Sequence, residues 1–140
     1  MNASSRPPED EGLPRGYQFK PEYELTPRMV KARLDEAPMS VLLIDCRTQP
    51  EWDLVHIPGS VHIPLDEIEE RAEEARPEPG QVVALICHHG VRSLRAALAL
   101  RALGIPGAMS VAGGIECWAL TADPRLKRYE RTGGVCRPLS

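Results

Sequence analysis

Short apolar runs alternate with longer segments of helical character along this chain. Residues 82–86 are all Val, Ala, Leu or Ile, and residues 40–44 form a second, largely apolar run that ends at Asp45. Runs of this length and composition predict strands that are buried inside a domain. Weaker strand signals occur at residues 23–25, 61–63 and 108–111.

The segments between these strands predict helices. Thr26 precedes Pro27, which indicates a helix start because Thr is a good N-cap and Pro fits the first helical position. Thr48 is placed to cap a short helix over residues 49–54. Further helices are expected over residues 66–75, 93–103 and 115–120. Strands that alternate with helices predict an α/β fold with a central, mostly parallel sheet flanked by helices.

Cys87 follows the 82–86 strand directly and stands just before a predicted helix. The order strand, tight loop, helix brings several backbone N–H groups and a helix N-terminus to one place, and both stabilise an anion. Such surroundings lower the pKa of a thiol, and the thiolate is the nucleophilic form. The carboxyl ends of strands are also where α/β folds bind ligands, and Asp45 lies at another such end. The pattern therefore predicts a reactive sulfur at Cys87.

Length and charge narrow the function classes. The chain has 140 residues and a net charge of -3, and its length favours one domain. The arginines are scattered and no basic run stands out, so we expect no nucleic-acid binding. No stretch approaches the roughly 20 apolar residues of a membrane span, and the first residues lack the apolar core of a signal peptide. We therefore expect a cytoplasmic protein, away from membranes, whose four cysteines are thiols.

Composition divides the chain into three expected segments. Residues 1–21 are polar and rich in Pro and Gly, which predicts a flexible or loosely attached tail. Residues 22–130 contain the predicted strands and helices and form the expected domain. Residues 131–140 are expected to be a C-terminal tail, in which Cys136 would be an exposed thiol.

Four motifs in fixed order identify a family resemblance. They are residues 43–47 with Glu51 following, the stretch from His56 to Pro64, the loop from Cys87 to Ser93, and residues 111–115 with Trp118. Each motif alone is weak, because a bare Cys-x-x-Gly recurs by chance. Together they resemble a single-domain rhodanese, the sulfurtransferase homology domain, over about residues 23–129.

This resemblance implies a five-stranded parallel sheet between helices and a two-step sulfur transfer. The Cys87 thiolate would attack the outer sulfur of a donor such as thiosulfate or a persulfide and become a persulfide itself. A thiophilic acceptor, either a small thiol or a sulfur-carrier protein, would then take the sulfur. Covalent catalysis of this kind divides one difficult displacement into two easier ones. The implied chemistry requires no cofactor and no metal ion.

The loop after Cys87 is the predicted substrate site, because its backbone amides suit an anionic donor or persulfide. Gly90 gives the loop the freedom to turn its amides inward. Arg92 would pair either with an anionic donor or with a neighbouring carboxylate that braces the loop. The side chains of His88 and His89 are expected to point outward, and Ser93 is expected to cap the following helix. The predicted substrate-binding residues are thus His88, His89, Gly90, Val91, Arg92 and Ser93.

Other landmark residues are expected to have structural roles. Asp45 and Arg47 lie at a strand end beside the predicted site, where we expect them to form an ion-pair network with Glu51. His56 is expected to form a hydrogen bond within its turn, and Trp118 to anchor the core. Three positions depart from the family pattern: Cys46 replaces a common aliphatic residue, Val55 a small residue, and Cys117 an alanine.

Two alternative functions stay open at this point. The first is a phosphatase or arsenate reductase, because the same fold family includes dual-specificity phosphatases, whose Cys-x-x-x-x-x-Arg loop has five intervening residues. Only four residues separate Cys87 from Arg92 here, and the smaller ring favours sulfur chemistry. The second alternative is a non-enzymatic carrier module that holds a persulfide only to pass it to one partner protein.

Overall fold

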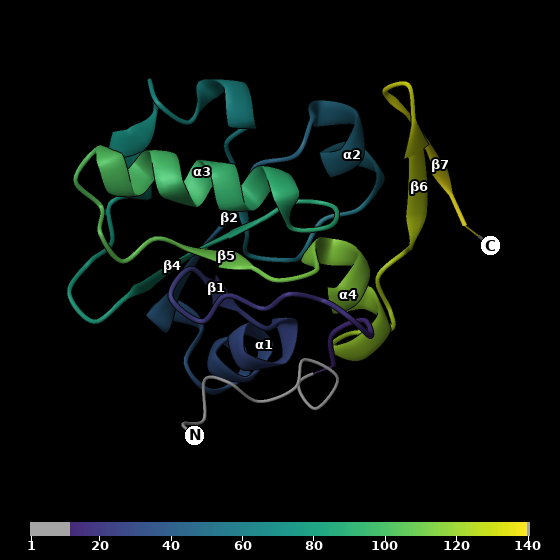
Figure 1. The fold of residues 1–140 in the computed structure, drawn as a ribbon, viewed down its shortest axis with the longest axis horizontal. Coiled ribbons are helices and arrows are strands. Elements are labelled where there is room, and N and C mark those ends of the chain that lie inside the picture. The colour runs from purple at the N-terminus through teal and green to yellow at the C-terminus, as the bar shows by residue number, and fades with distance from the viewer. Residues whose placement is uncertain (1–11, 140) are drawn as a thin grey trace.

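A computed structural model of the chain describes residues 12–139, so the prediction for residues 1–11 lies outside the described part. Figure 1 shows the helices α1 (Pro27–Glu36), α2 (Gln49–Leu54), α3 (Val91–Ala102) and α4 (Gly114–Thr121). The strands are β1 (Glu24–Leu25), β2 (Val41–Asp45), β3 (Val61–His62), β4 (Val82–Ile86), β5 (Met109–Val111), β6 (Tyr129–Thr132) and β7 (Val135–Pro138). One-turn 3-10 helices occur at η3 (Pro38–Ser40), η4 (Leu65–Glu67) and η5 (Ala72–Ala75).

Five strands form one parallel sheet in the order β1-β5-β4-β2-β3, which confirms the predicted α/β fold. The central pair is β2 and β4, and its register places Asp45 opposite Ile86 at the carboxyl end. Because all strands run the same way, the residues that follow β2 and β4 meet at one edge of the sheet. Cys87 is therefore carried to the same edge as the Asp45–Arg47 segment.

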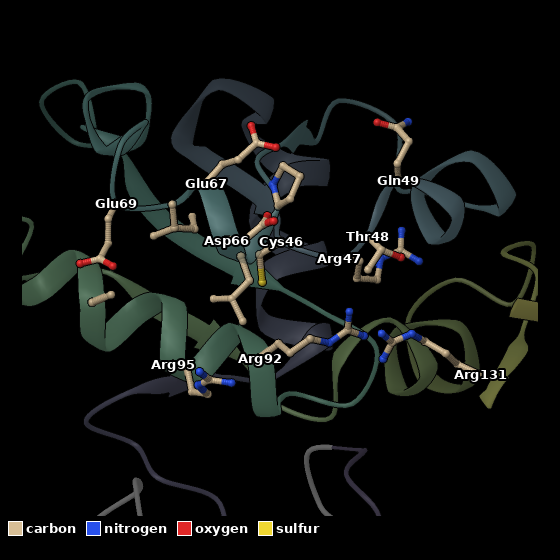
Figure 2. Close-up of a pocket in the computed structure, with 14 residues that line it drawn as sticks. Cys46, Arg47, Thr48, Gln49, Asp66, Glu67, Glu69, Arg92, Arg95 and Arg131 are labelled. Atoms are coloured by element: carbon tan, nitrogen blue, oxygen red, sulfur yellow. The ribbon is translucent and has the colours of Figure 1, made fainter. Parts of the chain in front are cut away.

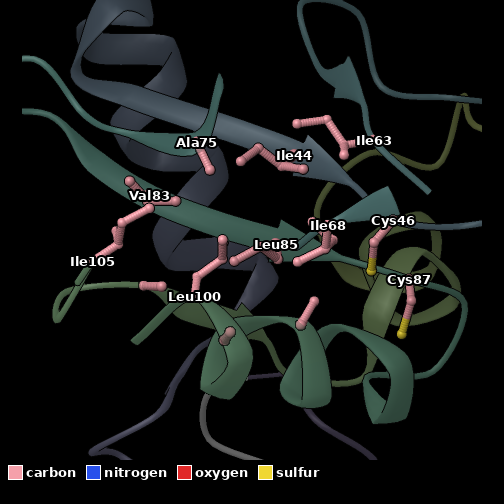
Figure 3. Packing of buried hydrophobic residues seen from close by; sticks show 13 residues of the cluster. Ile44, Cys46, Ile63, Ile68, Ala75, Val83, Leu85, Cys87, Leu100 and Ile105 are labelled. Carbon is pink, nitrogen blue, oxygen red and sulfur yellow. The ribbon is translucent and has the colours of Figure 1, made fainter. Parts of the chain in front are cut away.

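Both faces of the sheet are covered, which explains the uninterrupted apolar run in β4. Val83 and Leu85 pack with α3 on one face (Figure 3), whereas Ala84 and Ile86 join the cluster formed with α1 and α4 on the other. Successive strand side chains point to opposite faces, so an all-apolar strand serves two cores. Trp118 of α4 is 1% exposed in the second core, which confirms the predicted anchor.

Two predicted helix starts are confirmed by their capping contacts. The Thr26 hydroxyl accepts a hydrogen bond from the Met29 N–H at 3.1 Å, and α1 begins at the next residue, Pro27. Thr48 stands before α2, where its N–H and hydroxyl donate to the Glu51 carboxylate at 3.2 and 2.9 Å. Local side-chain chemistry sets these two helix boundaries.

The predicted helix over residues 66–75 is wrong. This segment forms the two short 3-10 helices η4 and η5 with turns between them, and Ile68 and Ala75 anchor it in the core. A continuous α-helix would place Glu69 over Glu73 and Glu70 over Glu74, and such like-charge pairs one turn apart are destabilising. In the observed segment, Arg71 pairs with Glu67 and Glu74.

The C-terminal residues expected as a tail form most of a hairpin. Strand β6 pairs with β7 in antiparallel register through a turn at Gly133 and Gly134. Both turn residues have positive φ, at 57° and 82°, which suits a two-residue hairpin turn. Tyr129, the first residue of β6, is 2% exposed and joins the hairpin to the core. The boundaries at residues 22 and 130 stay a prediction.

Residues 12–20 pack against the domain close to the active loop. Leu13 is 5% exposed and clusters with Ala112 and Cys117. The Tyr17 hydroxyl donates to the buried Glu24 carboxylate and accepts from the Gly113 N–H. Residues 12–20, which were expected to belong to the N-terminal tail, thus contact Ala112, Gly113 and Cys117. Within residues 12–139, no helix is long and apolar enough to cross a membrane.

Candidate active site

Cys87 is the first residue after β4, and its sulfur is held by the loop that follows. The Gly90 and Ser93 N–H groups donate to the Cys87 sulfur over 3.1 and 3.2 Å. The thiol itself lies 3.3 Å from the Ser93 hydroxyl, to which it donates. Two backbone donors at the start of a helix form the kind of site that stabilises a sulfur anion. The predicted convergence of amides on this thiol is therefore present in the structure.

Gly90 makes the turn between strand and helix. Its φ is 102°, a left-handed conformation that glycine adopts readily, and α3 begins at the next residue. A Cβ at Gly90 would lie 3.1 Å from the Gly113 nitrogen. Gly90 thus adopts the backbone conformation that was expected to require glycine. The side chain of Val91, the next residue, points outward and is 70% exposed.

Ser93 does not cap α3, contrary to the prediction. It is the third residue of the helix, and Gly90 is the residue at the N-cap. Because the helix begins two residues earlier than expected, the Ser93 side chain turns inward and is fully buried. Its hydroxyl lies 2.8 Å from the Ser110 hydroxyl and next to the Cys87 sulfur.

The N-terminus of α4 holds the other side of the loop. The Ile115 N–H donates to the Cys87 carbonyl at 2.8 Å, and the Glu116 N–H donates to the His88 carbonyl at 3.1 Å. A Cβ at Gly114 would lie 2.4 Å from the His88 oxygen, so only glycine permits this approach. Because α4 binds the loop carbonyls, the Gly90 N–H is left facing the sulfur.

Arg92 binds a neighbouring carboxylate, which is one of its two predicted roles. Its guanidinium donates to both oxygens of Glu51 at 2.7 and 2.9 Å. The Glu51 side chain is fully buried. Burial alone would raise the pKa of Glu51, but hydrogen bonds from Arg92 and Tyr129 outweigh it and hold this pKa well below its usual range. The pair joins α3 to α2 beside the loop.

The expected network of Asp45, Arg47 and Glu51 is present, with one additional member. Arg47 pairs with Asp45 at 2.7 Å, and both side chains are buried. Arg47 also donates to the Tyr129 hydroxyl at 3.1 Å, and this hydroxyl donates to Glu51 at 2.5 Å. The sequence motifs did not indicate Tyr129, because it reaches the network from the hairpin.

The two loop histidines have different environments. His89 is exposed as expected, but His88 is only 6% exposed, so its predicted outward orientation is wrong. The His88 ring stacks on the Tyr129 ring at a centroid distance of 4.0 Å, and its Nε2 lies 3.1 Å from the Tyr129 carbonyl oxygen. Burial lowers the pKa of His88 from 6.5 to about 4. The hairpin therefore covers His88 and keeps it neutral at physiological pH.

Two cavities are lined by Arg92 of the loop. The first, of about 550 Å³, is lined by Cys87, the two histidines and residues of the C-terminal hairpin. The second, of about 720 Å³, is shown in Figure 2 and contains Cys46 but not Cys87. Arg92 and Arg131 line both cavities. Cys87, which is 1% exposed, lines the first cavity and not the second.

His56 does not bond within its turn as predicted, because its Nδ1 lies 2.8 Å from the carbonyl oxygen of Trp52 in α2. Within residues 12–139, no group of three His, Cys, Asp or Glu side chains is placed to hold a metal ion. The four cysteines are free thiols in the structure. Cys136 is partly rather than fully exposed, and Cys117 is buried.

Residues 26–121 match the family model described as "Rhodanese-like domain", which is more than half of the 140-residue chain. The matched segment includes α1, the sheet from β2 onward and the loop between β4 and α3. The motifs that suggested the resemblance therefore lie inside the matched region.

Two curated relatives illustrate the similarity. The chain is 35% identical over 105 residues to the probable adenylyltransferase/sulfurtransferase MoeZ of Mycobacterium tuberculosis. It is 37% identical over 98 residues to the putative sulfur carrier protein YrkF of Bacillus subtilis. These matches cover 75% and 70% of this chain, but only 26% and 50% of the two relatives. The chain thus spans about a quarter and about half of their lengths.

Solved structures agree with the fold. The thiosulfate sulfurtransferase from Pseudomonas aeruginosa is 28% identical with a TM-score of 0.66, over 76% of this chain and 20% of that one. A rhodanese-like domain protein from Staphylococcus aureus is 29% identical with a TM-score of 0.63, over 77% of this chain and 99% of that one.

Proposed function

This chain belongs to the rhodanese-like domain family, and from that premise we propose that it is a sulfurtransferase that carries sulfur as a persulfide on Cys87. The observation that supports the proposal is the position of the Gly90 and Ser93 N–H groups around the Cys87 sulfur. Preorganised donors of this kind stabilise negative charge without reorganising during the reaction. They suit both the attacking thiolate and the persulfide that replaces it.

The first half-reaction loads the protein. The Cys87 thiolate attacks the outer sulfur of thiosulfate, a new S–S bond forms, and the bond to the sulfonate sulfur breaks so that sulfite leaves. A persulfide donor would react in the same way with a thiolate as the leaving group. The cavity of about 550 Å³ that Cys87 lines has room for either small donor.

The second half-reaction returns the thiolate. The acceptor attacks the outer sulfur of the Cys87 persulfide and takes it. Cyanide becomes thiocyanate, a thiol becomes a new persulfide, and a carrier protein becomes its sulfur-loaded form. We propose a thiol or a sulfur-carrier protein as the acceptor.

Arg92 has a positioning role in this proposal and does not bind the donor. Both of its contacts to Glu51 would break if it turned to a substrate anion. Arg131 lines both cavities, and its Nε lies 3.6 Å from the Glu51 carboxylate. It therefore adds a positive charge to that of Arg92 in both cavities. We propose that Arg131 attracts an anionic donor.

A phosphatase or arsenate reductase is a weaker proposal for this site. Only four residues separate Cys87 from Arg92, and the Arg92 guanidinium is engaged by Glu51. A phosphatase would need that guanidinium for the transferred oxyanion. Hydrolysis of an aryl phosphate at ordinary enzymatic rates would overturn our proposal.

A persulfide carrier is the second candidate, and the similarity to YrkF favours it. That relative is named a putative sulfur carrier protein and is 37% identical over 98 residues. A carrier would use the same Cys87 persulfide but would transfer it to one partner protein. Rapid transfer to a protein acceptor with slow turnover of thiosulfate and cyanide would support this function.

The test is thiocyanate formation from thiosulfate and cyanide by wild-type protein and by Cys87→Ser, with Cys136→Ser as a matched thiol control. We expect turnover by wild type and by the Cys136 variant, and none by Cys87→Ser. Equal turnover by Cys87→Ser would show that the sulfur does not pass through Cys87.

A further inference from the structure

Cys46 and Cys87 directly follow two neighbouring parallel strands. The register of β2 and β4 ends with Asp45 opposite Ile86, so the next residue on each strand is a cysteine. The Cys46 N–H donates to the Ile86 carbonyl at 3.0 Å, which extends the pairing to this position. Neighbouring strands lie roughly 4.7–4.9 Å apart, and disulfides join Cα atoms roughly 4.4–6.8 Å apart. The backbone therefore brings the two cysteines within disulfide range.

The two side chains also lie on the same face of the sheet. Both belong to the cluster that packs under α3, together with Ile44 and Leu85. Figure 3 shows both sulfur atoms directed to the same side, toward the first turn of α3. Cys117 and Cys136 pack in two other clusters, so they are not placed to meet Cys87.

Cys46 is a buried thiol with one weak partner. It is 1% exposed, and its sulfur donates to the Ile86 carbonyl over 3.5 Å. Burial, and secondly the nearby Cys87 sulfur, raises the pKa of Cys46 well above its ordinary value. Cys46 therefore remains protonated beside the reactive sulfur and does not compete with Cys87 for a donor.

We propose that Cys46 resolves the Cys87 persulfide and so gives this protein a second activity, the release of sulfide from sulfane sulfur. The inference rests on the proposed function, because it starts from the Cys87 persulfide. The Cys46 thiol first loses its proton to solvent in the cavity of about 720 Å³ that it lines, and the resulting thiolate attacks the inner sulfur of the persulfide, which is Cys87 Sγ. A Cys46–Cys87 disulfide forms, the bond from Cys87 Sγ to the outer sulfur breaks, and that sulfur leaves as hydrosulfide with the proton of the Cys87 persulfide. The outer sulfur is reduced, and the two cysteine sulfurs are oxidised.

Cys46 and Cys87 line different cavities, and this arrangement suits the proposed step. The outer sulfur would occupy the cavity of about 550 Å³ that Cys87 lines, and Cys46 does not line that cavity. Cys46 is thus placed to meet the inner sulfur while the leaving sulfur has open space. Cys46 lines the cavity of about 720 Å³ instead. A small thiol entering there can attack Cys46 in the disulfide, which releases the Cys87 thiolate, and a second thiol then frees Cys46.

The test is to load wild type, Cys46→Ala and Cys117→Ala with thiosulfate in buffer free of thiols, and to follow intact mass and released sulfide. We expect wild type to gain one sulfur mass briefly, then to release one sulfide per chain and to end two hydrogen masses below the reduced protein. Cys46→Ala should keep the added sulfur and release none. Cys117→Ala, which removes another buried thiol, should behave as wild type.

The experiment distinguishes a missing role of Cys46 from a missing sulfur-carrying role of Cys87. If wild type and Cys46→Ala hold the added sulfur equally long without sulfide release, Cys46 is not a resolving thiol, although Cys87 still carries sulfur. If neither protein gains sulfur, the thiol oxidant diamide tests the pair independently. A peptide crosslinked through Cys46 and Cys87 would then support the pair, and its absence would overturn it. Cys46→Val repeats the comparison if the alanine variant does not fold.

Discussion

Arg92 donates two hydrogen bonds to Glu51, at 2.7 and 2.9 Å, and so fixes the start of α3 to α2. The contact connects the catalytic loop to the rest of the fold by a charge pair whose carboxylate is completely buried. Tyr129 donates to the same carboxylate and also contacts Arg47. Loop geometry therefore depends on a network that lies outside the loop itself.

Glu51→Gln should destabilise the protein markedly. The substitution keeps the shape of the side chain but leaves Arg92 without its anion, and removing one partner of a buried ion pair costs about 3–5 kcal/mol. Urea unfolding measures the change in the free energy of unfolding. Glu69→Gln, at an exposed glutamate, is the matched control and should stay close to wild type. A Glu51 variant as stable as this control would show that the ion pair does not hold the loop.

Ser93→Ala should slow the loading of Cys87 with sulfur while leaving the fold intact. The hydroxyl accepts from the Cys87 thiol over 3.3 Å and would donate to the thiolate once the thiol loses its proton, and a hydrogen bond to a charged group contributes about 1.5–3 kcal/mol. A loss of that size corresponds to a rate roughly 10- to 100-fold lower. Rapid-quench mass spectrometry gives the loading rate. Ser60→Ala, outside the site, should load at the wild-type rate, and an equal rate for Ser93→Ala would exclude a role for the hydroxyl.

Gly114→Ala should disrupt the support that α4 gives to the loop. The new Cβ would lie 2.4 Å from the His88 oxygen at a φ of 64°, so backbone must move. Overpacking and positive φ each cost on the order of 1–3 kcal/mol. Gly107→Ala is the control, because a Cβ there meets nothing within 4 Å. Thermal unfolding should separate the two variants clearly, and equal midpoints would contradict the close approach.

Acid should weaken the fold in part through His88. The pKa of His88 falls from 6.5 to about 4 on folding, so between these values the unfolded chain binds a proton that the folded protein does not. The stability from this group is complete above pH 6.5, falls as the pH drops, and stops falling below about 4. His89 also lowers the pKa of His88, whereas Glu51 and Glu116 raise it, and each of these effects is smaller than that of burial.

His88→Phe removes the titrating group and keeps an aromatic ring against Tyr129. Its unfolding free energy should fall less steeply than that of wild type between pH 6.5 and about 4. His56→Gln, at an exposed histidine outside the loop, should keep the wild-type slope. If the two variants show the same slope, His88 does not contribute to the acid sensitivity.

Local sequence signals predicted the parts of the fold that depend on neighbours in the chain. Thr26 and Thr48 cap the helices that follow them, and the β4 run leads into the loop at Cys87 as expected. The error at Ser93 arose because Gly90 acts as the N-cap, which moved the helix start by two residues.

Contacts between segments that are far apart along the chain could not be predicted from local sequence signals. The burial of His88 depends on Tyr129, which is 41 positions away along the chain. Gly133 and Gly134 form the turn that pairs β7 with β6, and this Gly-Gly pair was the sequence signal available for the hairpin. The glutamate-rich segment at residues 66–75 resembles a helix by composition, but repulsion between like charges favours the turns.

The most direct test of the central claim is the intact mass of wild type and Cys87→Ser after brief exposure to thiosulfate, followed by cyanide. We predict that wild type gains one sulfur mass during the brief exposure and loses it to cyanide added at once, before Cys46 resolves the persulfide, and that Cys87→Ser never gains it. A gain of sulfur by Cys87→Ser would contradict the assignment of Cys87 as the sulfur carrier. The absence of any gain on wild type, with thiosulfate and with a persulfide donor alike, would contradict sulfur transfer itself.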